Sequence, residues 1–487
     1  MDTLTAVLIG SAIILGARIL AHILKFRGYF ELIEVPRVRE TTYGLHRVVF
    51  PTFDVACMHK YGRVWGKYEG VTPHVFIVEP ELLKDVLVKR FESFVERQYF
   101  PMEDKHRSLV DARSDAWKTM RKALTPLFTS GKLKNMFVNM HSVADEFMDA
   151  IRAHLKTSDV VDMKPLFQAL SLDTIANCAF GVNTNSFQRP KNSLFQRCQD
   201  LFSDMRVKNA TESALLLLGS YFPKVLEWID LFGLENFEYL FNTTRDIALE
   251  RQESRGDFVD KLREMKSECD KGKGDLNEDQ IFAQGVGFFQ AGFETSSNTM
   301  TTLMYSLAKN PKVQESAFEE VKEVLKETKG VVDYEAIAKM TYLEAVIKEN
   351  LRLNPPVTRI DRTCMKDTMI GGETSPRLKL KKGTVVQIPI YALHRNPDFF
   401  PDPNTFKPER FMEKDESMGD MTFLAFGGGP RVCIGMRFAM SEMKIALAKF
   451  ISQFRVTDTS HTKLDLLPGD SFFLAYPEMK VRIESRD

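Results

Sequence analysis

The longest helical pattern in the chain limits its fold more than any other feature. It spans residues 277–309, where Asn277 can cap the first turn together with Gln280 three residues later. An Asn-Pro pair at residues 310–311 ends the pattern. A helix of about 30 residues is far above the globular mean, so we expect it to cross the whole domain that contains it.

The rest of the chain is expected to be mainly helical with small β-sheets, an α+β fold class. Residues 115–125 and 342–353 carry apolar side chains at helical spacing, and prolines end both patterns. Strand patterns are few and lie at residues 63–70, 74–80, 384–390 and 479–485. The charged stretch at 253–280 is typical of a helix with a short loop, and no Gly/Ser linker divides residues 40–487. A single large domain is therefore predicted at residues 28–487.

The N-terminus is predicted to be a membrane anchor. Residues 4–24 are apolar except for Arg18 and His22, and as a helix they would span about 31 Å, enough for a bilayer core. Basic residues follow the segment, which places the rest of the chain on the cytoplasmic side. A cleaved signal peptide normally begins with basic residues, whereas Asp2 is acidic. Residues 1–27 are thus expected to form a transmembrane helix with its flank, rather than a signal peptide or a buried core helix.

The charge balance and the cysteines exclude several classes of protein. Sixty-six basic residues balance sixty-six acidic residues, so nothing in the overall charge predicts a nucleic-acid partner. Six cysteines are scattered singly without a C-x-x-C pair, which argues against a zinc module and a disulfide scaffold. A cysteine with a chemical role would therefore act alone.

One cysteine lies in the glycine-rich stretch "FGGGPRVCIG", residues 426–435. A lone thiolate suits the axial position of a haem iron, and the helix expected after Cys433 would stabilise negative sulfur. Gly429 allows a sharp turn, Gly435 leaves space for a flat macrocycle, and Arg431 could bind a haem propionate. The alternative is a buried structural cysteine in a tight turn, which is the commoner role of a lone cysteine.

The complete spacing F-x-x-G-x-R-x-C-x-G, which begins at Phe426, closely resembles the cytochrome P450 family of haem-thiolate monooxygenases. The resemblance covers nearly all of residues 45–487 and is closest to the membrane-bound branch that includes animal drug- and steroid-oxidising enzymes. It implies the cytochrome P450 fold for a catalytic domain at residues 28–487 and a haem b cofactor (iron protoporphyrin IX). Cys433 would be the axial iron ligand, with Phe426 and Gly435 beside the cofactor.

A second motif of the family matches Glu349 and Arg352. Their i, i+3 spacing alone predicts an exposed ion pair worth less than about 1 kcal/mol. In the family, this E-x-x-R pair is instead buried beneath the haem and is joined by an arginine of a later "PERF" segment, here Arg410. The resemblance therefore implies a structural role for all three side chains.

The stretch "FFQAGFETSS" within the long helix resembles the oxygen-binding motif of the family. Ala291 and Thr295 share a helix face, and Gly292 beside them would leave room for a diatomic ligand. By the resemblance, Thr295 would hydrogen-bond the distal oxygen and Glu294 would feed a proton relay. The alternative is that these hydroxyls bond back to helix carbonyls without a catalytic role.

Further cofactor and substrate contacts follow from the resemblance. Trp117 and Arg121 match the W-x-x-x-R helix that binds a haem propionate, although an amphipathic helix explains the spacing equally well. Arg97 and Arg362 are additional propionate candidates, although loop arginines are usually just solvated. Segments that line the pocket in relatives carry Phe289, Gln290, Phe293, Val357, Ile360, Phe472 and Phe473. These residues suggest a lipophilic substrate, and Gln290 would seek a polar partner on it because relatives usually carry an apolar residue there.

No flavin or nicotinamide motif is visible, so the electrons are expected to come from NADPH–cytochrome P450 reductase, with cytochrome b5 as a second donor. A basic dock is predicted at Lys118, Lys122, Lys132, Lys134, Arg437 and Lys444, although a mixed, solvated surface explains them almost as well. The apolar residues 214–234 either enter the membrane near a substrate entrance or pack in the core.

The expected protein is an endoplasmic-reticulum monooxygenase that faces the cytoplasm and inserts one oxygen atom into a xenobiotic, steroid or lipid. The alternatives are a reductase-independent haem-thiolate isomerase or dehydratase, and a non-catalytic haem sensor.

Overall fold

The structure, a computed structural model, describes residues 20, 24–39, 47–98, 103–189, 191–204, 206–221, 233–372, 374–412, 420–457, 460, 464, 466–469, 473, 474, 476 and 478–486. Its α-helices are α2 (Tyr29–Leu32), α3 (Phe50–Tyr61), α4 (Pro80–Lys84), α5 (Ser114–Leu124), α6 (Ser130–Leu155), α7 (Met163–Phe180), α8 (Ser193–Asp204), α9 (Ala210–Tyr221), α10 (Leu234–Glu250), α11 (Phe258–Asp270), α12 (Glu278–Lys309), α13 (Pro311–Glu327), α14 (Tyr334–Lys339), α15 (Thr341–Leu353), α16 (Ile390–Leu393) and α17 (Met436–Gln453). Its strands are β1 (Val64–Glu69), β2 (Thr72–Ile77), β3 (Val160–Asp162), β4 (Arg359–Thr363), β5 (Thr368–Ile370), β6 (Leu378–Leu380), β7 (Val385–Pro389), β8 (Phe454–Val456) and β9 (Lys480–Ser485). The prediction of a mainly helical chain with small sheets is confirmed.

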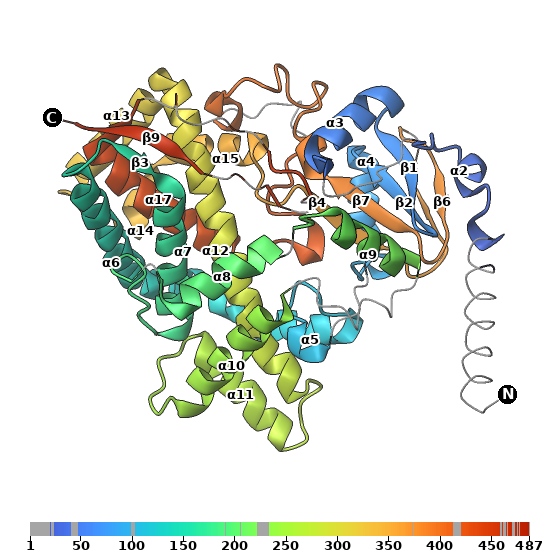
Figure 1. The fold of residues 1–487 in the computed structure, drawn as a ribbon, viewed down its shortest axis with the longest axis horizontal. Coiled ribbons are helices and arrows are strands. Elements are labelled where there is room, and N and C mark those ends of the chain that lie inside the picture. The colour runs from blue at the N-terminus through green and yellow to red at the C-terminus, as the bar shows by residue number, and fades with distance from the viewer. Residues whose placement is uncertain are drawn as a thin grey trace.

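Helix α12 is the spine of the helical part, as its length predicted (Figure 1). The predicted capping box is present: the Asn277 side chain accepts from the Gln280 N–H, and the Gln280 side chain accepts from the Asn277 N–H. Helices α7, α10, α15 and α17 pack against α12, so most of its side chains are buried. Its buried Thr302 hydroxyl donates to the carbonyl of Asn298, which satisfies this polar group within the helix.

The largest sheet has the strand order β1-β2-β7-β4 and lies beside the helical part (Figure 1). Strands β1 and β2 form an antiparallel hairpin, β2 pairs in parallel with β7, and β7 pairs antiparallel with β4. One face packs its apolar side chains, among them the stacked pair Trp65 and Phe76, into a core with α2 and α4. A second core lies among the helices, and the candidate site lies between the two.

Strand prediction succeeded where apolar residues run together or alternate, and it failed where strands are short or charged. The four predicted strands are β1, β2, β7 and β9. Strand β4 was missed because "RIDRT" carries three charged residues in five, although four of its five side chains are buried. Strands β3, β5, β6 and β8 have only three residues each, too few for a period to appear.

Within the residues that the structure describes, no helix is both long and apolar enough to cross a membrane. Almost all of the predicted anchor at residues 4–24 lies outside them. Phe26, Tyr29 and Phe30, which follow it, are buried in the core beside the sheet. The boundary at residue 28 stays a prediction.

Candidate active site

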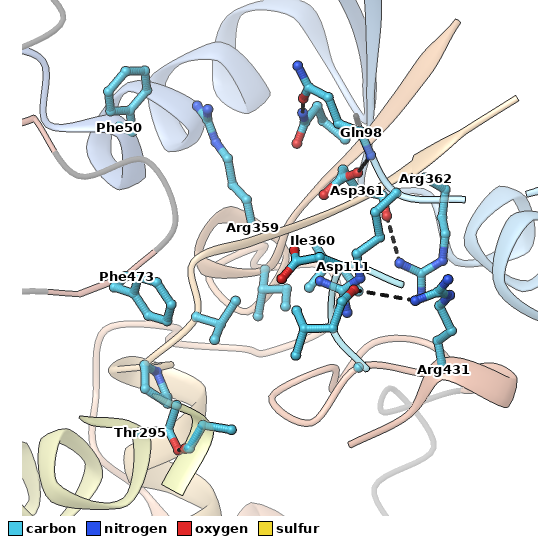
Figure 2. A pocket seen from close by; sticks show the side chains of 18 of the residues that line it. Phe50, Gln98, Asp111, Thr295, Arg359, Ile360, Asp361, Arg362, Arg431 and Phe473 are labelled. Atoms are coloured by element: carbon cyan, nitrogen blue, oxygen red, sulfur yellow. Dashed lines mark hydrogen bonds between the residues drawn. The ribbon is translucent and has the colours of Figure 1, made fainter. Parts of the chain in front are cut away.

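A cavity of about 1380 Å³ separates the sheet from α12, α5 and the loop that carries Cys433. Ligand pockets usually measure about 300–1,000 Å³, so this cavity has room for a large cofactor together with a second molecule. Side chains from the sheet, from the loop at residues 107–113 and from α12 converge on it (Figure 2). Much of its wall is apolar and includes Leu109, Phe128, Ile175, Phe288, Val357 and Ile360.

The loop before Cys433 folds through glycine conformations that other residues rarely adopt. Gly427 and Gly429 have φ values of +73° and +68°. A Cβ atom on Gly429 would lie 1.9 Å from the carbonyl oxygen of Leu87, so the position requires glycine. The Cys433 N–H donates to the carbonyl of Phe426 at 2.9 Å and closes the loop.

Cys433 is exposed and lines the cavity. The expected helix begins three residues later, at Met436. Burial raises the pKa of the Cys433 thiol, whereas a hydrogen bond from the Gly435 N–H and the nearby Arg121 guanidinium lower it. A Cβ atom on Gly435 would meet only the Phe128 ring, at 3.8 Å, so the surface beside the sulfur is open to a flat group.

Three arginines gather at one edge of the cavity, and within the described residues none of them forms an ion pair with a carboxylate. The Nε atoms of Arg97, Arg362 and Arg431 are buried and lack hydrogen-bond partners among the described residues. Burial and the charge of Arg97 lower the pKa of Arg362 and of Arg431 to about 9. Figure 2 shows the Arg362 and Arg431 side chains close together at this edge. Such a cluster is stabilised when anions join it, so the donor set fits a haem, whose thiolate ligand would be Cys433 and whose propionates would meet these arginines.

Helix α5 supports the same edge. Trp117 is buried, and the Arg431 guanidinium lies 4.5 Å from the centre of its ring. Arg121 donates to the carbonyl of Val432 at 2.9 Å and thereby ties α5 to the cysteine loop. Both side chains line the cavity, so the helix is amphipathic and also contributes to the candidate site.

Gln290, Ala291, Gly292 and Thr295 of α12 all line the cavity. The Thr295 hydroxyl donates to the Ala291 carbonyl at 2.6 Å, which is the back-bonding that the alternative interpretation expected, yet the residue still lies on the wall. A Cβ atom on Gly292 would come within 3.1 Å of the Ile175 side chain, so glycine also allows α7 to pack closely here. Phe288 and Thr299 line the same wall, and helical spacing from Ala291 and Thr295 could have located them.

The structure does not bring Glu294, Phe289 or Phe293 to the cavity. Because successive helical residues turn by about 100°, these three residues face α7 and α8 instead. The Glu294 carboxylate accepts from Gln168 at 3.1 Å, and burial raises its pKa. Phe289 stacks on Phe180 with ring centres 4.2 Å apart, and Phe293 is fully buried.

The remaining predicted wall residues come from two segments that pair with each other. Val357 and Ile360 line the cavity, and an antiparallel bridge joins Val357 to Phe473, which lines it too. Phe472 lies outside the described residues. Helix α9 also lines the cavity, whereas residues 222–232 of the apolar stretch at 214–234 are not described.

The Glu349–Arg352 pair is fully buried, as the resemblance implied, and is not the exposed pair that spacing alone predicted. Arg352 Nε and Nη2 donate to the two carboxylate oxygens at 2.7 and 2.8 Å. The Lys407 N–H donates to the same carboxylate, and Arg410 Nε lies 3.5 Å from it. The cluster fixes the chain segment that follows α16.

His394 connects this ion pair to the cysteine loop, a role that no sequence pattern indicated. Arg352 Nη1 donates to the His394 carbonyl at 2.9 Å, and the ring Nε2 accepts from the Leu424 N–H at 2.9 Å. The ring Nδ1 lies 3.2 Å from the Arg352 carbonyl and therefore carries the proton. Burial, then the Arg352 charge, lower the pKa of His394 to about 3, so it remains neutral.

Other wall residues were missed because distant segments assemble them. His74, Gln387 and Arg359 reach the cavity from three strands of the sheet, and Asp111 reaches it from the loop before α5. The strand predictions at 74–80 and 384–390 contained two of them but could not show which face they occupy. No pattern of residues around Asp111 in the sequence indicated that it would line a cavity.

The predicted basic dock is partly corrected. Lys444 is buried and pairs with Glu344 at 3.1 Å, so it cannot contact another protein. Lys122 and Arg437 are exposed, and within the described residues they form no ion pair. Of the remaining lysines, Lys118 pairs with Glu92, Lys132 donates to the Gly256 carbonyl, and Lys134 lies over the Tyr334 ring.

Comparison with known proteins agrees with this geometry. A family model described as "Cytochrome P450" matches residues 47–483. Cytochrome P450 3A29 of Sus scrofa is 35% identical over 459 residues, which cover 90% of this chain and 88% of the relative. Cytochrome P450 3A18 of Rattus norvegicus is 34% identical over 451 residues (89% and 88%), and cytochrome P450 3A5 of Homo sapiens is 33% identical over 449 residues (89% and 87%). The similarity spans nearly the whole of each chain.

Proposed function

This chain belongs to the cytochrome P450 family and is a monooxygenase with haem b as its cofactor, and from that premise we propose that it oxidises lipophilic substrates, namely a xenobiotic, steroid or lipid. The observation that carries the proposal is the opening of the Cys433 thiol into a large cavity with many apolar side chains. Haem with a thiolate ligand activates O₂, and one oxygen atom is inserted into a bound substrate. An apolar wall favours substrates whose binding removes hydrocarbon from water.

In the proposal, each residue of the cavity edge has a distinct role toward the cofactor. Cys433 would supply the thiolate that binds the haem iron, and the Gly435 N–H and Arg121 would moderate its negative charge. Arg97, Arg362 and Arg431 would bind the propionates, and the Trp117 ring, against which Arg431 packs, would hold that guanidinium in place. The buried Glu349–Arg352 pair acts only on the position of the loop.

Proton delivery is assigned to Thr295. Its hydroxyl donates to the Ala291 carbonyl, so a rotation about χ1 would free the proton for a group in the cavity. Glu294 is the proposed proton source, because burial keeps more of it protonated than an ordinary carboxyl group. Its carboxylate faces Gln168, so water must carry the proton between Glu294 and Thr295.

The proposed electron donor is NADPH–cytochrome P450 reductase, with cytochrome b5 as a second donor, at the endoplasmic-reticulum membrane. The sequence supports this because it has no nicotinamide or flavin motif of its own and has an apolar N-terminus. Exposed Lys122 and Arg437 lie on the two helices that flank the cysteine loop. The double variant Lys122→Glu/Arg437→Glu should slow NADPH-supported turnover and spare peroxide-supported turnover. Equal loss of both would reject this dock.

The decisive experiment is the optical spectrum of the reduced, carbon-monoxide-bound protein. A red-shifted Soret band is expected, and Cys433→Ala should abolish the shift because the sulfur ligand is gone. Product from a panel of lipophilic compounds should then require reductase, NADPH and O₂. Product without reductase or O₂ would indicate an isomerase or dehydratase instead, and haem binding without any product would indicate a sensor.

A further inference from the structure

Asp111 is a charged residue of the cavity wall that has no role in the proposed function. Asp111 belongs to the loop before α5 and lines the cavity. Its N–H donates to the Ser108 carbonyl at 3.0 Å, and the carbonyls of Val110 and Ala112 on either side accept from Arg431. The backbone of Asp111 is therefore held firmly in place.

The side chain of Asp111 is directed away from the arginine edge. Figure 2 shows its carboxylate turned toward Ile360 and the interior of the pocket, while the Arg362 and Arg431 guanidiniums gather on the other side. Across the described residues, no hydrogen bond or ion pair reaches this carboxylate. Burial raises its pKa, and the charges of Arg97, Arg107 and Arg431 lower it while that of Asp361 raises it.

A carboxylate that faces an apolar cavity keeps its charge at a large cost unless an opposite charge or hydrogen-bond donors join it. Arg431 donates through Nη1 and Nη2 to backbone carbonyls, and Arg362 donates through Nη1 to the Asp361 carbonyl, so within the described residues neither guanidinium donates to the Asp111 carboxylate. Propionates at the arginine edge would further neutralise the positive charge that Asp111 experiences. Asp111 then presents a negative charge to a cavity with many apolar side chains. A ligand that satisfies both features is a cation with an apolar body.

We propose that Asp111 is a specificity-determining residue that selects lipophilic cations, with its carboxylate beside a substituted ammonium group while the apolar wall holds the rest of the molecule. The inference rests on the proposed function, because it names the substrate class of the same cavity. Asp111 acts on binding and takes no part in the oxidation step.

The test compares two probes of the same shape on the full-length, haem-loaded protein in phosphatidylcholine nanodiscs. One probe is a phenylalkyl-trimethylammonium ion, which has no lone pair and cannot bind iron, and the other is its neutral tert-butyl isostere. Equilibrium dialysis gives both dissociation constants. The wild type should prefer the cation, and Asp111→Asn should weaken cation binding by about tenfold or more with little change for the isostere.

Two further variants control the test. Asp111→Glu should keep the preference for the cation because it keeps the charge. Asp115→Asn removes the same charge from an exposed carboxylate of α5 that does not line the cavity, and it should leave the preference intact. Equal loss of both probes in Asp111→Asn, or no loss of either, overturns the inference, and so does a fall in haem content, which would assign Asp111 to the cofactor. The Soret band of the wild type, recorded first, reports separately on the proposed function.

Discussion

Replacing Arg352 by lysine should destabilise the protein far more than a conservative change of charge suggests. Arg352 makes five hydrogen bonds: two to the Glu349 carboxylate, at 2.7 and 2.8 Å, and three to the carbonyls of His394, Pro403 and Thr405, at 2.9, 2.7 and 3.2 Å. All five guanidinium donors are used, and the side chain is completely buried. A lysine has three donors at a single point, so at least two buried acceptors would lose their partner.

The expected cost follows from those lost partners. A buried acceptor without a partner costs about 1–3 kcal/mol, so Arg352→Lys should lower the free energy of unfolding by about 2–6 kcal/mol. Domains are stable by only about 5–15 kcal/mol, so the variant should also load haem poorly. Urea unfolding followed by far-ultraviolet circular dichroism measures the first effect, and the Soret absorbance per chain measures the second.

A matched control is available at the surface. Arg455 donates to Glu484 at 2.8 Å, but the two side chains are 55% and 39% exposed. Arg455→Lys should therefore cost no more than about 1 kcal/mol, since exposed ion pairs contribute little. If Arg352→Lys costs no more than Arg455→Lys, or leaves haem loading unchanged, the reasoning from donor geometry is refuted.

Three more predictions concern the cysteine loop, His394 and the arginine edge. Gly429→Ala should prevent haem loading, because Gly429 has a φ of +68° and a Cβ atom there would collide with the Leu87 carbonyl. Gly131→Ala, in the first turn of α6, is the control: its Cβ atom has no described neighbour within 4 Å, so this variant should load haem normally, and the Soret absorbance per chain compares the two. The pKa of His394 is lowered to about 3 in the folded chain, so below pH 6.5 the His394 ring binds a proton in the unfolded chain but stays neutral in the folded chain. Its contribution to the free energy of unfolding should fall as pH drops from 6.5 toward 3, by about 1.4 kcal/mol per pH unit, and His394→Gln should remove that slope in urea titrations at pH 7.0 and 5.5. An identical slope in the variant would contradict the assignment. Arg362→Met should stabilise the apoprotein, because it removes a buried charge from a repelling cluster, but should speed haem transfer to apomyoglobin; slower or unchanged transfer would argue against a propionate contact.

The sequence could locate elements whose information is local. The capping residues of α12 identified its start to the residue, and apolar runs or alternating apolar residues indicated β1, β2, β7 and β9. The glycines around Cys433 likewise encoded a strained turn before a helix, because backbone conformation depends on the residue itself.

The burial of a side chain and the direction in which it points could not be predicted in this way, because segments distant in the sequence determine both. The Glu349–Arg352 spacing is the same for an exposed and a buried pair, and only packing against α16 and the segment after it excludes water from it. The side chains of Phe289 and Phe293 point to α7 and α8 because those helices cover that face of α12. Asp111 faces the cavity because Arg431, more than 300 residues later in the chain, holds its loop.

The residues that destabilise the folded protein at this cavity are the same ones that would bind its cofactor. Three guanidiniums crowd one edge of the cavity, and two glycines hold the cysteine loop in left-handed conformations. Charge repulsion disfavours the first feature and backbone strain disfavours the second. Proteins retain such unfavourable features chiefly at functional sites. The buried network of Glu349, Arg352 and His394 supplies the opposing stability, because it anchors Leu424 at the start of the same loop. Haem binding should then add directly to the free energy of unfolding, since only the folded chain can bring the arginines and the thiolate together.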